Sequence, residues 1–237
     1  MRSSSRIDLS HRVSPRELPE LMDGDCSYEA FRDCLHSLEQ VNRWLLGYRP
    51  TLRWLERLPR DLRQSMHIAD VGSGGGDFLR KIAGWARRNA MDVQLTGIDL
   101  NPHAARAAAE STPKELEIEW VTGDALKYRP SRPVDIIVNS LLTHHLEDEQ
   151  IVALLRWMEM TAQVGWFIND LERDEWSYRM FNWVPWHPIV RHDGPVSFRR
   201  AFRKADWVNL LTAAGVPLQA VTIEHWRPGR LCVGRWK

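Results

Sequence analysis

Short segments with a strand-like pattern alternate along this chain with longer segments whose apolar residues recur at helical spacing. Five short segments are expected to form strands: 67–71, 93–99, 117–121, 134–139 and 165–169. Apolar residues between Phe78 and Ala86, and those within 102–111 and 148–161, have helical spacing. Regular alternation of strands and helices indicates an α/β fold, a mostly parallel sheet with helices on both faces.

The two ends of the chain add to this sheet. A last amphipathic helix is expected over 204–214, stopped by Gly215, followed by an antiparallel strand pair over 216–225 and 231–235. Residues 1–26 are polar and broken by prolines and a glycine, which predicts a flexible arm. Helices are expected from Ser27, a capping residue, to Leu46 and from Thr51 to Leu58. This helical pair fits either a packing layer over the sheet or a lid over a ligand site.

These boundaries predict an arm and helical lid over 1–59 and a main domain over 60–237. An aromatic segment within the main domain, about 172–200, is expected to form a helix ending at Pro185 and Pro188 and then an irregular cap. The cap is either an apolar roof for an organic substrate or a helix packed on the domain. Within it, 191–195 is expected to form a polar turn that brings His192 toward the cleft.

A glycine-rich turn follows the first strand of the main domain. Asp70 precedes four glycines at 72, 74, 75 and 76. Such a turn offers free backbone N–H groups and a helix N-terminus to an anionic group. The dinucleotide fingerprint Gly-x-Gly-x-x-Gly is not satisfied, because its sixth place is Asp77 or Leu79. An acid before the glycines suits an ammonium group beside a carboxylate, so we expect an amino-acid end. A structural tight turn is the alternative.

Polar residues also follow the next two strands. Asp99 can accept hydrogen bonds from both hydroxyls of a ribose, or it can cap the helix at Pro102, a task that Asn101 could perform instead. Asp124 can accept a hydrogen bond from an exocyclic amine such as that of adenine, and the Ala125 N–H can bind a ring nitrogen. The alternative for Asp124 is a turn-stabilising role.

His144 and His145 follow the fourth strand, at the edge where open α/β sheets bind ligands. Either could act as a general base, or both could be structural packing residues. Adjacent side chains point in different directions, so at most one of them is expected to perform chemistry.

Composition excludes several classes of protein. The chain has 237 residues, 43% of them hydrophobic, which suffices for one sizeable core. Its net charge of +1 argues against a nucleic-acid partner. It contains no apolar run of membrane-spanning length and no clustered metal-ligand set, so we expect neither a membrane span nor a metal. Cys26, Cys34 and Cys232 are far apart and predict reduced thiols in a cytoplasmic protein.

Taken together, the acid-then-glycine turn, Asp99, Gly123-Asp124-Ala125 and the strand ending at Asn139 resemble the class I S-adenosylmethionine-dependent methyltransferases over about residues 60–237. The resemblance implies a Rossmann-like seven-stranded sheet with an antiparallel strand at its C-terminal end. It also implies that S-adenosylmethionine is the cofactor. By position, the methionine part would be held by Asp70, Gly72, Gly74 and Gly76, the ribose by Asp99 with Leu100, and adenine by Asp124 and Ala125; Asn139 and the residues just beyond it would line the methyl-transfer channel.

Within this family, the chain looks most like small-molecule O- or C-methyltransferases and resembles the quinone-biosynthesis enzymes. The segments 41–45 and 191–195 are similar to bacterial methyltransferases of polyketide-type phenolic or pyrone products. We therefore expect O-methylation of a small, largely apolar acceptor in secondary metabolism, with His144 or His145 as the base and His192 as the third choice. Residues 139–142 lack the Asn/Asp-Pro-Pro-aromatic element of DNA-methylating relatives.

Two other functions stay open at this point. A nicotinamide-dependent oxidoreductase shares the sheet and the ribose acid, but the missing third glycine and the absence of a Tyr-x-x-x-Lys pair disfavour it. A non-catalytic member of the methyltransferase family would keep the same cofactor motifs. The oligomeric state, monomer or homodimer, is left open.

Overall fold

The computed structural model describes residues 7–21, 24, 27–59, 62, 65–184, 186 and 188–237. Two residues used in the sequence analysis, Cys26 and Pro185, lie outside the described residues. Among the helices that are described, none is both long enough and apolar enough to cross a membrane.

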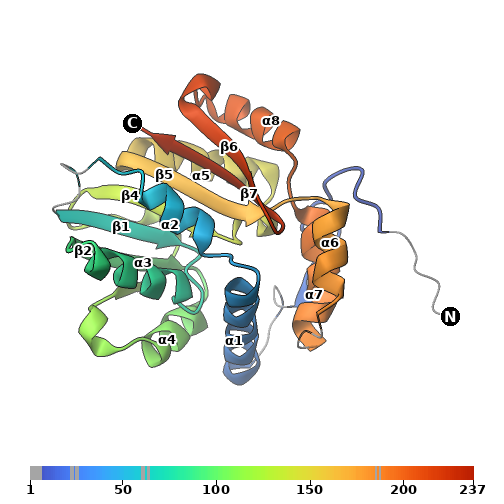
Figure 1. Cartoon of the computed structure of the whole chain (residues 1–237), viewed down its shortest axis with the longest axis horizontal. Coiled ribbons are helices and arrows are strands. Elements are labelled where there is room, and N and C mark those ends of the chain that lie inside the picture. Colours follow the sequence, from blue (N-terminus) through green and yellow to red (C-terminus); the bar gives the residue numbers. More distant parts are fainter. Residues whose placement is uncertain are drawn as a thin grey trace.

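A seven-stranded sheet in the order β3-β2-β1-β4-β5-β7-β6 forms the centre of the molecule (Figure 1). Only β7 runs antiparallel, and it pairs with both β5 and β6. The predicted fold is therefore confirmed, although several strand ends differ by a few residues. The strands are β1 Ser65–Val71, β2 Asp92–Asp99, β3 Glu119–Thr122, β4 Val134–Ser140, β5 Ala162–Leu171, β6 Val221–Trp226 and β7 Arg230–Trp236.

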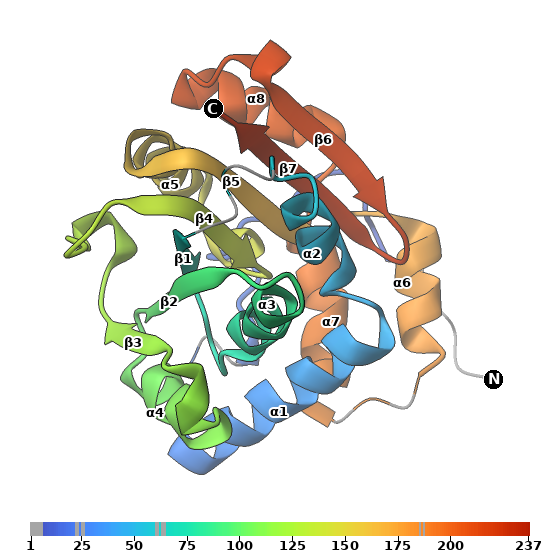
Figure 2. The ribbon, with the colours of Figure 1, turned by 60° about the vertical axis from the view of Figure 1, so that its left-hand side comes forward.

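Helices cover both faces of this sheet. Apolar residues of α2 and α3 form one buried cluster with β1, and those of α5 and α8 form another on the opposite face. Helix α1 contacts α4 and α7 and lies near the carboxyl ends of the strands (Figure 2). The helices are α1 Tyr28–Trp44, α2 Arg49–Leu55, α3 Asp77–Arg88, α4 Pro102–Ser111, α5 Asp148–Thr161, α6 Glu175–Asn182, α7 Pro188–Arg200 and α8 Lys204–Ala214.

Local signals in the sequence set several of these helix ends. The Ser27 hydroxyl accepts a hydrogen bond from the Ala30 N–H, which caps α1 as predicted. Gly215 adopts a left-handed conformation, with φ of 78°, and ends α8. Asn101 caps α4 by accepting from the His103 N–H, which leaves Asp99 available for another role.

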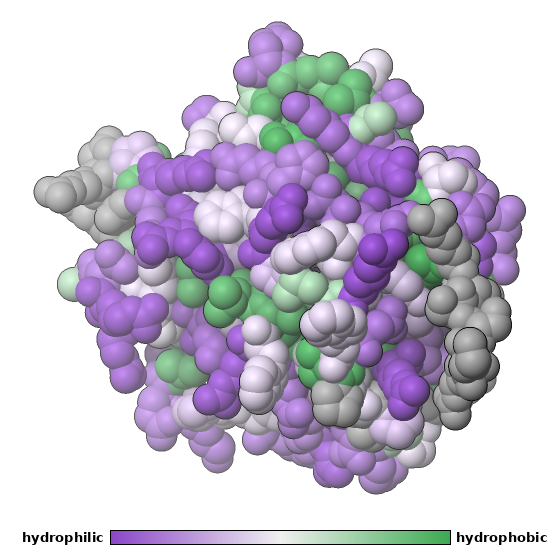
Figure 3. Space-filling view, turned by 45° about the vertical axis from the view of Figure 1, so that its right-hand side comes forward, coloured by the Kyte–Doolittle hydropathy of each residue, from purple (hydrophilic) through white to green (hydrophobic). Residues whose placement is uncertain are grey.

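The polar turn predicted over 191–195 is wrong, because these residues lie within α7. Pro195 removes one helical hydrogen bond, a cost that normally disfavours the helix interior. Tertiary packing outweighs this cost: Val190 and Phe198 are buried in one cluster with Phe181 of α6 and Val41 of α1. The face of the molecule in Figure 3 carries hydrophobic residues among hydrophilic ones, and Trp176 and Met180 of α6 remain 45% and 37% exposed.

The described part of the N-terminal arm, residues 7–21, is bound to the domain instead of flexible. Leu9 and Val13 are buried, and the Val13 N–H donates to the Arg199 carbonyl over 3.0 Å. Arginines from the far end of the chain bind carbonyls of the arm: Arg173 donates to Leu9 and Arg200 to Leu18. Hydrogen bonds between residues so far apart in the chain leave no periodic pattern in the sequence. The polar composition of the arm alone therefore led to the wrong prediction of a flexible segment.

A stacked pair of tryptophans joins α2 to the sheet. Trp54 is almost fully buried, and its ring lies parallel to that of Trp236 with centroids 3.7 Å apart. It also stacks on Phe167 of β5. This contact makes α2 part of the main core and not a separate layer.

We expect Trp54→Ala to lower the free energy of unfolding by about 3–5 kcal/mol, because it removes a large buried side chain and leaves a cavity. Urea denaturation followed by circular dichroism measures this change. Trp44→Ala, at a position that is 75% exposed on α1, is the matched control and should stay within about 0.5 kcal/mol of the parent. Equal effects of the two substitutions would contradict the assignment of α2 to the core.

Candidate active site

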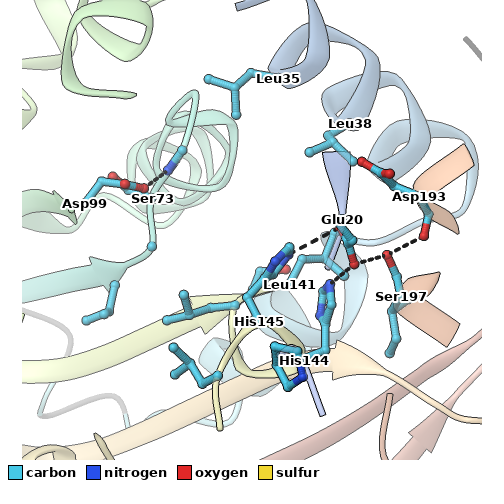
Figure 4. Close-up of a pocket in the computed structure, with 18 of the residues that line it drawn as sticks. Glu20, Leu35, Leu38, Ser73, Asp99, Leu141, His144, His145, Asp193 and Ser197 are labelled. Carbon is cyan, nitrogen blue, oxygen red and sulfur yellow. Dashed lines mark hydrogen bonds and ion pairs between the residues drawn. The ribbon is translucent and has the colours of Figure 1, made fainter. Parts of the chain in front are cut away.

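A cavity of about 1080 Å³ opens at the carboxyl ends of β1, β2 and β4. Strands β1 and β4 are neighbours in the sheet although their chain connections lead in opposite directions, and open α/β sheets bind ligands at such a switch point. The N-terminal arm, α1, α6 and α7 supply the other walls. One end of the cavity therefore carries the predicted cofactor residues, and the other lies beneath the arm and the helices (Figure 4).

The glycine turn forms the floor of the cofactor end. Gly72 and Gly74 have φ of +71° and +48°, a region that favours glycine, and both line the cavity. The Gly72 N–H donates to the Ile98 carbonyl over 2.8 Å, which ties the turn to β2. Gly76 is not among the lining residues, since a Cβ there would overlap the ring of Trp120. The structure thus places Gly76 in a packing position, whereas Gly72 and Gly74 face the cavity.

Asp70 supplies a buried carboxylate with one oxygen that accepts no hydrogen bond from the described residues. Its Oδ1 has no hydrogen-bond partner among the described residues, although the side chain is almost fully buried and lines the cavity. Burial raises the pKa of Asp70 well above its usual value, and the nearby carboxylates of Asp77 and Asp99 raise it further. An orphaned acidic oxygen of this kind fits a ligand that brings a positive charge.

Asp99 lies opposite the turn, at the end of β2. Its carboxylate accepts from the Gly74 N–H and the Asn101 N–H, each over 2.9 Å. Burial raises the pKa of Asp99, and these backbone hydrogen bonds offset part of the effect. Asp99 lines the cavity together with Leu100, so both residues are placed where the ribose interpretation needs them.

The residues predicted for adenine also line the cavity, beside the end of β3. The Asp124 carboxylate accepts from the Leu126 N–H over 3.0 Å, as the turn-stabilising alternative requires. Its second oxygen and the N–H of Ala125 stay compatible with a ligand. Asn139 is placed differently: it is buried, with its amide 3.9 Å from the Met158 sulfur of α5. It does not line the cavity, whereas Ser140, Leu141 and Leu142 just beyond it do.

His144 is held in one orientation by an acid from the next strand. Its Nδ1 lies 2.6 Å from Asp170 Oδ1, and its backbone N–H donates to Asp170 Oδ2. Burial would raise the pKa of Asp170, but its contact with His144 and the hydrogen bonds from the Thr143 hydroxyl and the Leu171 N–H hold it below its usual value. Since a carboxylate can only accept, the hydrogen lies on Nδ1 of His144. The Nε2 lone pair is then free to take a proton.

His145 has the opposite arrangement. Its Nδ1 lies 3.5 Å from Nη1 of Arg200, and a guanidinium can only donate. In the neutral ring the hydrogen is therefore on Nε2. Both His144 and His145 line the cavity, whereas His192 does not: its side chain is 57% exposed and pairs with Asp193 over 2.9 Å. The structure brings two of the three predicted base candidates to the site.

Sequence reasoning missed three residues around this histidine pair: Glu20, Asp170 and Arg200. Asp170 had a readable signal, because it is an acid at the end of β5 and β5 pairs with β4. Glu20 and Arg200 form an ion pair of 3.2 Å between the arm and α7. The sequence around each of the two residues gives no indication of this pairing.

Glu20, His144 and His145 form a cluster of metal-type ligands among the described residues, with all three ligand atoms within 4.8 Å of one another. A positive charge is already present there, since the guanidinium of Arg200 lies against both Glu20 and His145. The arrangement therefore satisfies the carboxylate with an arginine, and a divalent cation would have to compete with it.

Comparison with known proteins agrees with this geometry. Residues 68–164 match the family model of a methyltransferase domain. A trans-aconitate 2-methyltransferase of Klebsiella pneumoniae (strain 342) is 30% identical over 187 residues, which cover 76% of this chain and 67% of that enzyme. A second one, from Streptomyces avermitilis, is 33% identical over 95 residues, which are 39% of this chain and 34% of that protein.

Solved structures show the same fold. Human N-acetylserotonin methyltransferase in complex with S-adenosylmethionine superposes with a TM-score of 0.63 at 18% identity, covering 89% of this chain and 56% of the human one. The plantazolicin methyltransferase BpumL, in complex with a pentazolic desmethylPZN analogue and S-adenosylhomocysteine, has a TM-score of 0.57 at 16% identity; the match covers 86% of this chain and 85% of BpumL.

These findings support the methyltransferase interpretation over the oxidoreductase alternative. The orphaned acid of Asp70 fits the positive charge of the sulfonium nucleoside, and a diphosphate would meet three carboxylates here. The chain belongs to the class I S-adenosylmethionine-dependent methyltransferases, and S-adenosylmethionine is its cofactor.

Proposed function

We propose that this enzyme transfers a methyl group to a hydroxyl of a small, largely apolar acceptor of the phenolic, pyrone or polyketide type. The observation that supports this proposal is one continuous cavity. It joins the cofactor residues to the His144–His145 pair, and its acceptor end has apolar walls from α1, α5, α6 and α7. These walls are lined by Leu38, Val41, Leu45, Leu146, Leu154, Met180, Phe181, Val190 and Phe198.

The cofactor residues proposed here act by binding and orientation. Asp70 would face the positive part of the cofactor, Gly72 and Gly74 would let its methionine end approach the backbone, and Asp99 with Leu100 would hold the ribose. Asp124 and Ala125 would bind adenine. When bound, S-adenosylmethionine supplies an already activated methyl group, so alignment of the acceptor accounts for much of the acceleration.

We propose His144 as the general base. Asp170 fixes the hydrogen on its Nδ1, which leaves Nε2 able to accept the proton of an acceptor hydroxyl. His145, with the hydrogen on Nε2, would donate a hydrogen bond to the same oxygen. The two adjacent histidines would thus perform different tasks because Asp170 and Arg200 impose different tautomers.

Trans-aconitate, the substrate in the name of the relatives, is a tricarboxylate, and the cavity is a poor match for it. Among the described residues that line the cavity, acids outnumber arginines. The arginines are Arg16, whose side chain is 84% exposed, and Arg230, which is buried and bound to Asn42. Cys34 and Cys232 are both buried and not joined in a disulfide, which fits the proposed cytoplasmic location. A partner other than a small molecule is not needed by this function.

A methyl-transfer assay tests the proposed reaction directly. Purified enzyme and labelled S-adenosylmethionine are incubated with a panel of neutral phenols, hydroxypyrones and apolar amines, and the products are identified by mass spectrometry. We expect O-methyl ethers of phenols or pyrones. Exclusive methylation of nitrogen or carbon, or of polycarboxylates, would contradict the proposal.

Substitution of the two histidines separates their tasks. We expect His144→Gln to lower kcat by about 10²–10⁴-fold, because the base is lost, and His145→Gln to lower it less. The dissociation constant of the cofactor, measured by calorimetry, should stay within about twofold for both. A parallel loss of turnover and cofactor binding in His144→Gln would show a structural role instead.

The raised pKa of Asp70 predicts a pH-dependent cofactor affinity. The positive cofactor favours the ionised carboxylate, so binding should release a proton and become tighter as the pH rises toward the raised pKa. Calorimetry in two buffers of different ionisation enthalpy measures the released proton. Uptake of a proton, or an affinity independent of pH, would contradict this assignment.

In the free protein, the raised pKa of Asp70 makes folding stability fall as the pH rises, whereas cofactor affinity rises. The pKa of Asp70 is above 3.8, the value for an unperturbed carboxyl, so its contribution to folding stability is fully present below that pH and is lost as the pH rises through the raised pKa. Asp70→Asn should therefore raise the Tm of the free protein at neutral pH while weakening cofactor binding about tenfold or more. Asp92→Asn, at the exposed start of β2, is the control.

A further inference from the structure

The acceptor end of the cavity carries negative charge beside its apolar walls. Glu20, Glu147, Glu149 and Asp193 line it. Two arginines oppose these four acids: Arg16, whose largely exposed side chain lies 3.6 Å from Glu147, and Arg200, which pairs with Glu20 over 3.2 Å and is not among the residues that line the cavity. A negatively charged acceptor would therefore meet like charges when it enters.

Glu20 is the acid that reaches the histidine pair. It is carried by the N-terminal arm, is 5% exposed and accepts a hydrogen bond from the Ser197 hydroxyl over 2.7 Å. Arg200 lies behind it and also donates to the Leu18 and Pro15 carbonyls, over 2.8 and 3.2 Å. Figure 4 shows the Glu20 carboxylate between the Ser197 hydroxyl and the two histidines, where an incoming acceptor would meet it.

The geometry leaves room for one acceptor atom at this point. Glu20 Oε1 lies 3.9 Å from His144 Nε2, and Glu20 Oε2 lies 3.9 Å from His145 Nε2. Both separations are too long for direct hydrogen bonds. Since the three ligand atoms lie within 4.8 Å of one another, a single oxygen or nitrogen can lie about 2.8 Å from each of them.

We propose that Glu20 is a specificity-determining residue that selects acceptors whose reacting end is neutral or positively charged. This inference rests on the proposed function and adds which charge the acceptor can carry at its reacting end. An acceptor hydroxyl next to a second N–H or O–H donor can bind His144 and Glu20 together. An acceptor with a carboxylate beside its reacting hydroxyl places a second negative charge against Glu20. That carboxylate also loses its water shell on binding, and no favourable contact at Glu20 compensates the cost.

The arm is then part of the active site and not an accessory extension. Pro15, Arg16, Pro19 and Glu20 all line the cavity. Ser14 and the Arg16 N–H bind Glu147 at the start of α5, over 2.9 and 3.1 Å, which holds the arm across the acceptor end. Glu20 therefore lies in the cavity only while the arm keeps these contacts with the start of α5.

Matched pairs of acceptors test the proposal without requiring turnover. Each pair is a neutral phenol and the same phenol with a carboxylate next to the hydroxyl. Their dissociation constants are measured by calorimetry on the full chain saturated with S-adenosylhomocysteine. We expect the parent protein to bind the neutral member at least about tenfold more tightly, and Glu20→Gln to reduce that preference by about tenfold. Glu17→Gln, an exposed position on the same arm, should keep it.

Three binding outcomes would overturn the proposal: equal binding of both members by the parent, an unchanged preference in Glu20→Gln, or no binding of either member. The affinity for S-adenosylhomocysteine, measured in the same experiments, shows independently whether the methyltransferase site is intact. Glu20→Gln leaves Arg200 with one fewer partner and could unfold the arm. Hydrogen exchange of the backbone amides of residues 7–21 is therefore compared between Glu20→Gln and the parent: we expect equal protection, and loss of protection in the variant would overturn the proposal.

Discussion

An excess of negative charge around the end of β1 is the constraint on which this structure depends. Asp70, Asp77 and Asp99 gather at the glycine turn, and burial raises the pKa of Asp70 and Asp99. Asp77 is satisfied by the Tyr48 hydroxyl and the Asn42 amide, and Asp99 by two backbone N–H groups. Asp70 Oδ1 has no such partner among the described residues. The positive cofactor completes this site, so binding stabilises the folded enzyme as well as preparing it for reaction.

The same turn anchors the helix that walls the acceptor end. Arg80 of α3 donates to the Gly75 carbonyl over 2.6 Å and forms an ion pair with Glu39 of α1 over 2.7 Å. Asn42 of α1 binds Asp77 and also accepts from Arg230 of β7. Helix α1 is thus connected to the cofactor turn by charged and polar contacts, whereas α2 is buried in the core. Of the two interpretations left open for the N-terminal helices, packing describes α2, and α1 contributes to the cavity wall.

The sequence was most informative where structure depends on neighbours along the chain. All seven strands and most helix ends followed from apolar spacing and capping residues, because a strand buried on both faces and a Ser27 cap are local features. Most of the predicted cofactor residues line the cavity, because they directly follow strands whose ends meet at one edge of the sheet, a relation that the order of strands along the chain already indicates. The errors arose where distant residues decide: Pro195 stays helical through burial of α7, and the arm is ordered by arginines almost two hundred positions away.

The division of the cavity also explains why family membership says little about the acceptor. The methyltransferase family model matches residues 68–164, which include the glycine turn, Asp99, Asp124 and the histidine pair. The arm, α1, α6 and α7 lie outside that range, and they supply Glu20, Arg200 and most of the apolar wall. The histidine pair and four other residues of the acceptor end, Leu146, Glu147, Glu149 and Leu154, lie inside the matched range. Differences in the segments before and after the matched range can therefore alter the charge and shape of the acceptor end while the residues that line the cofactor end stay the same.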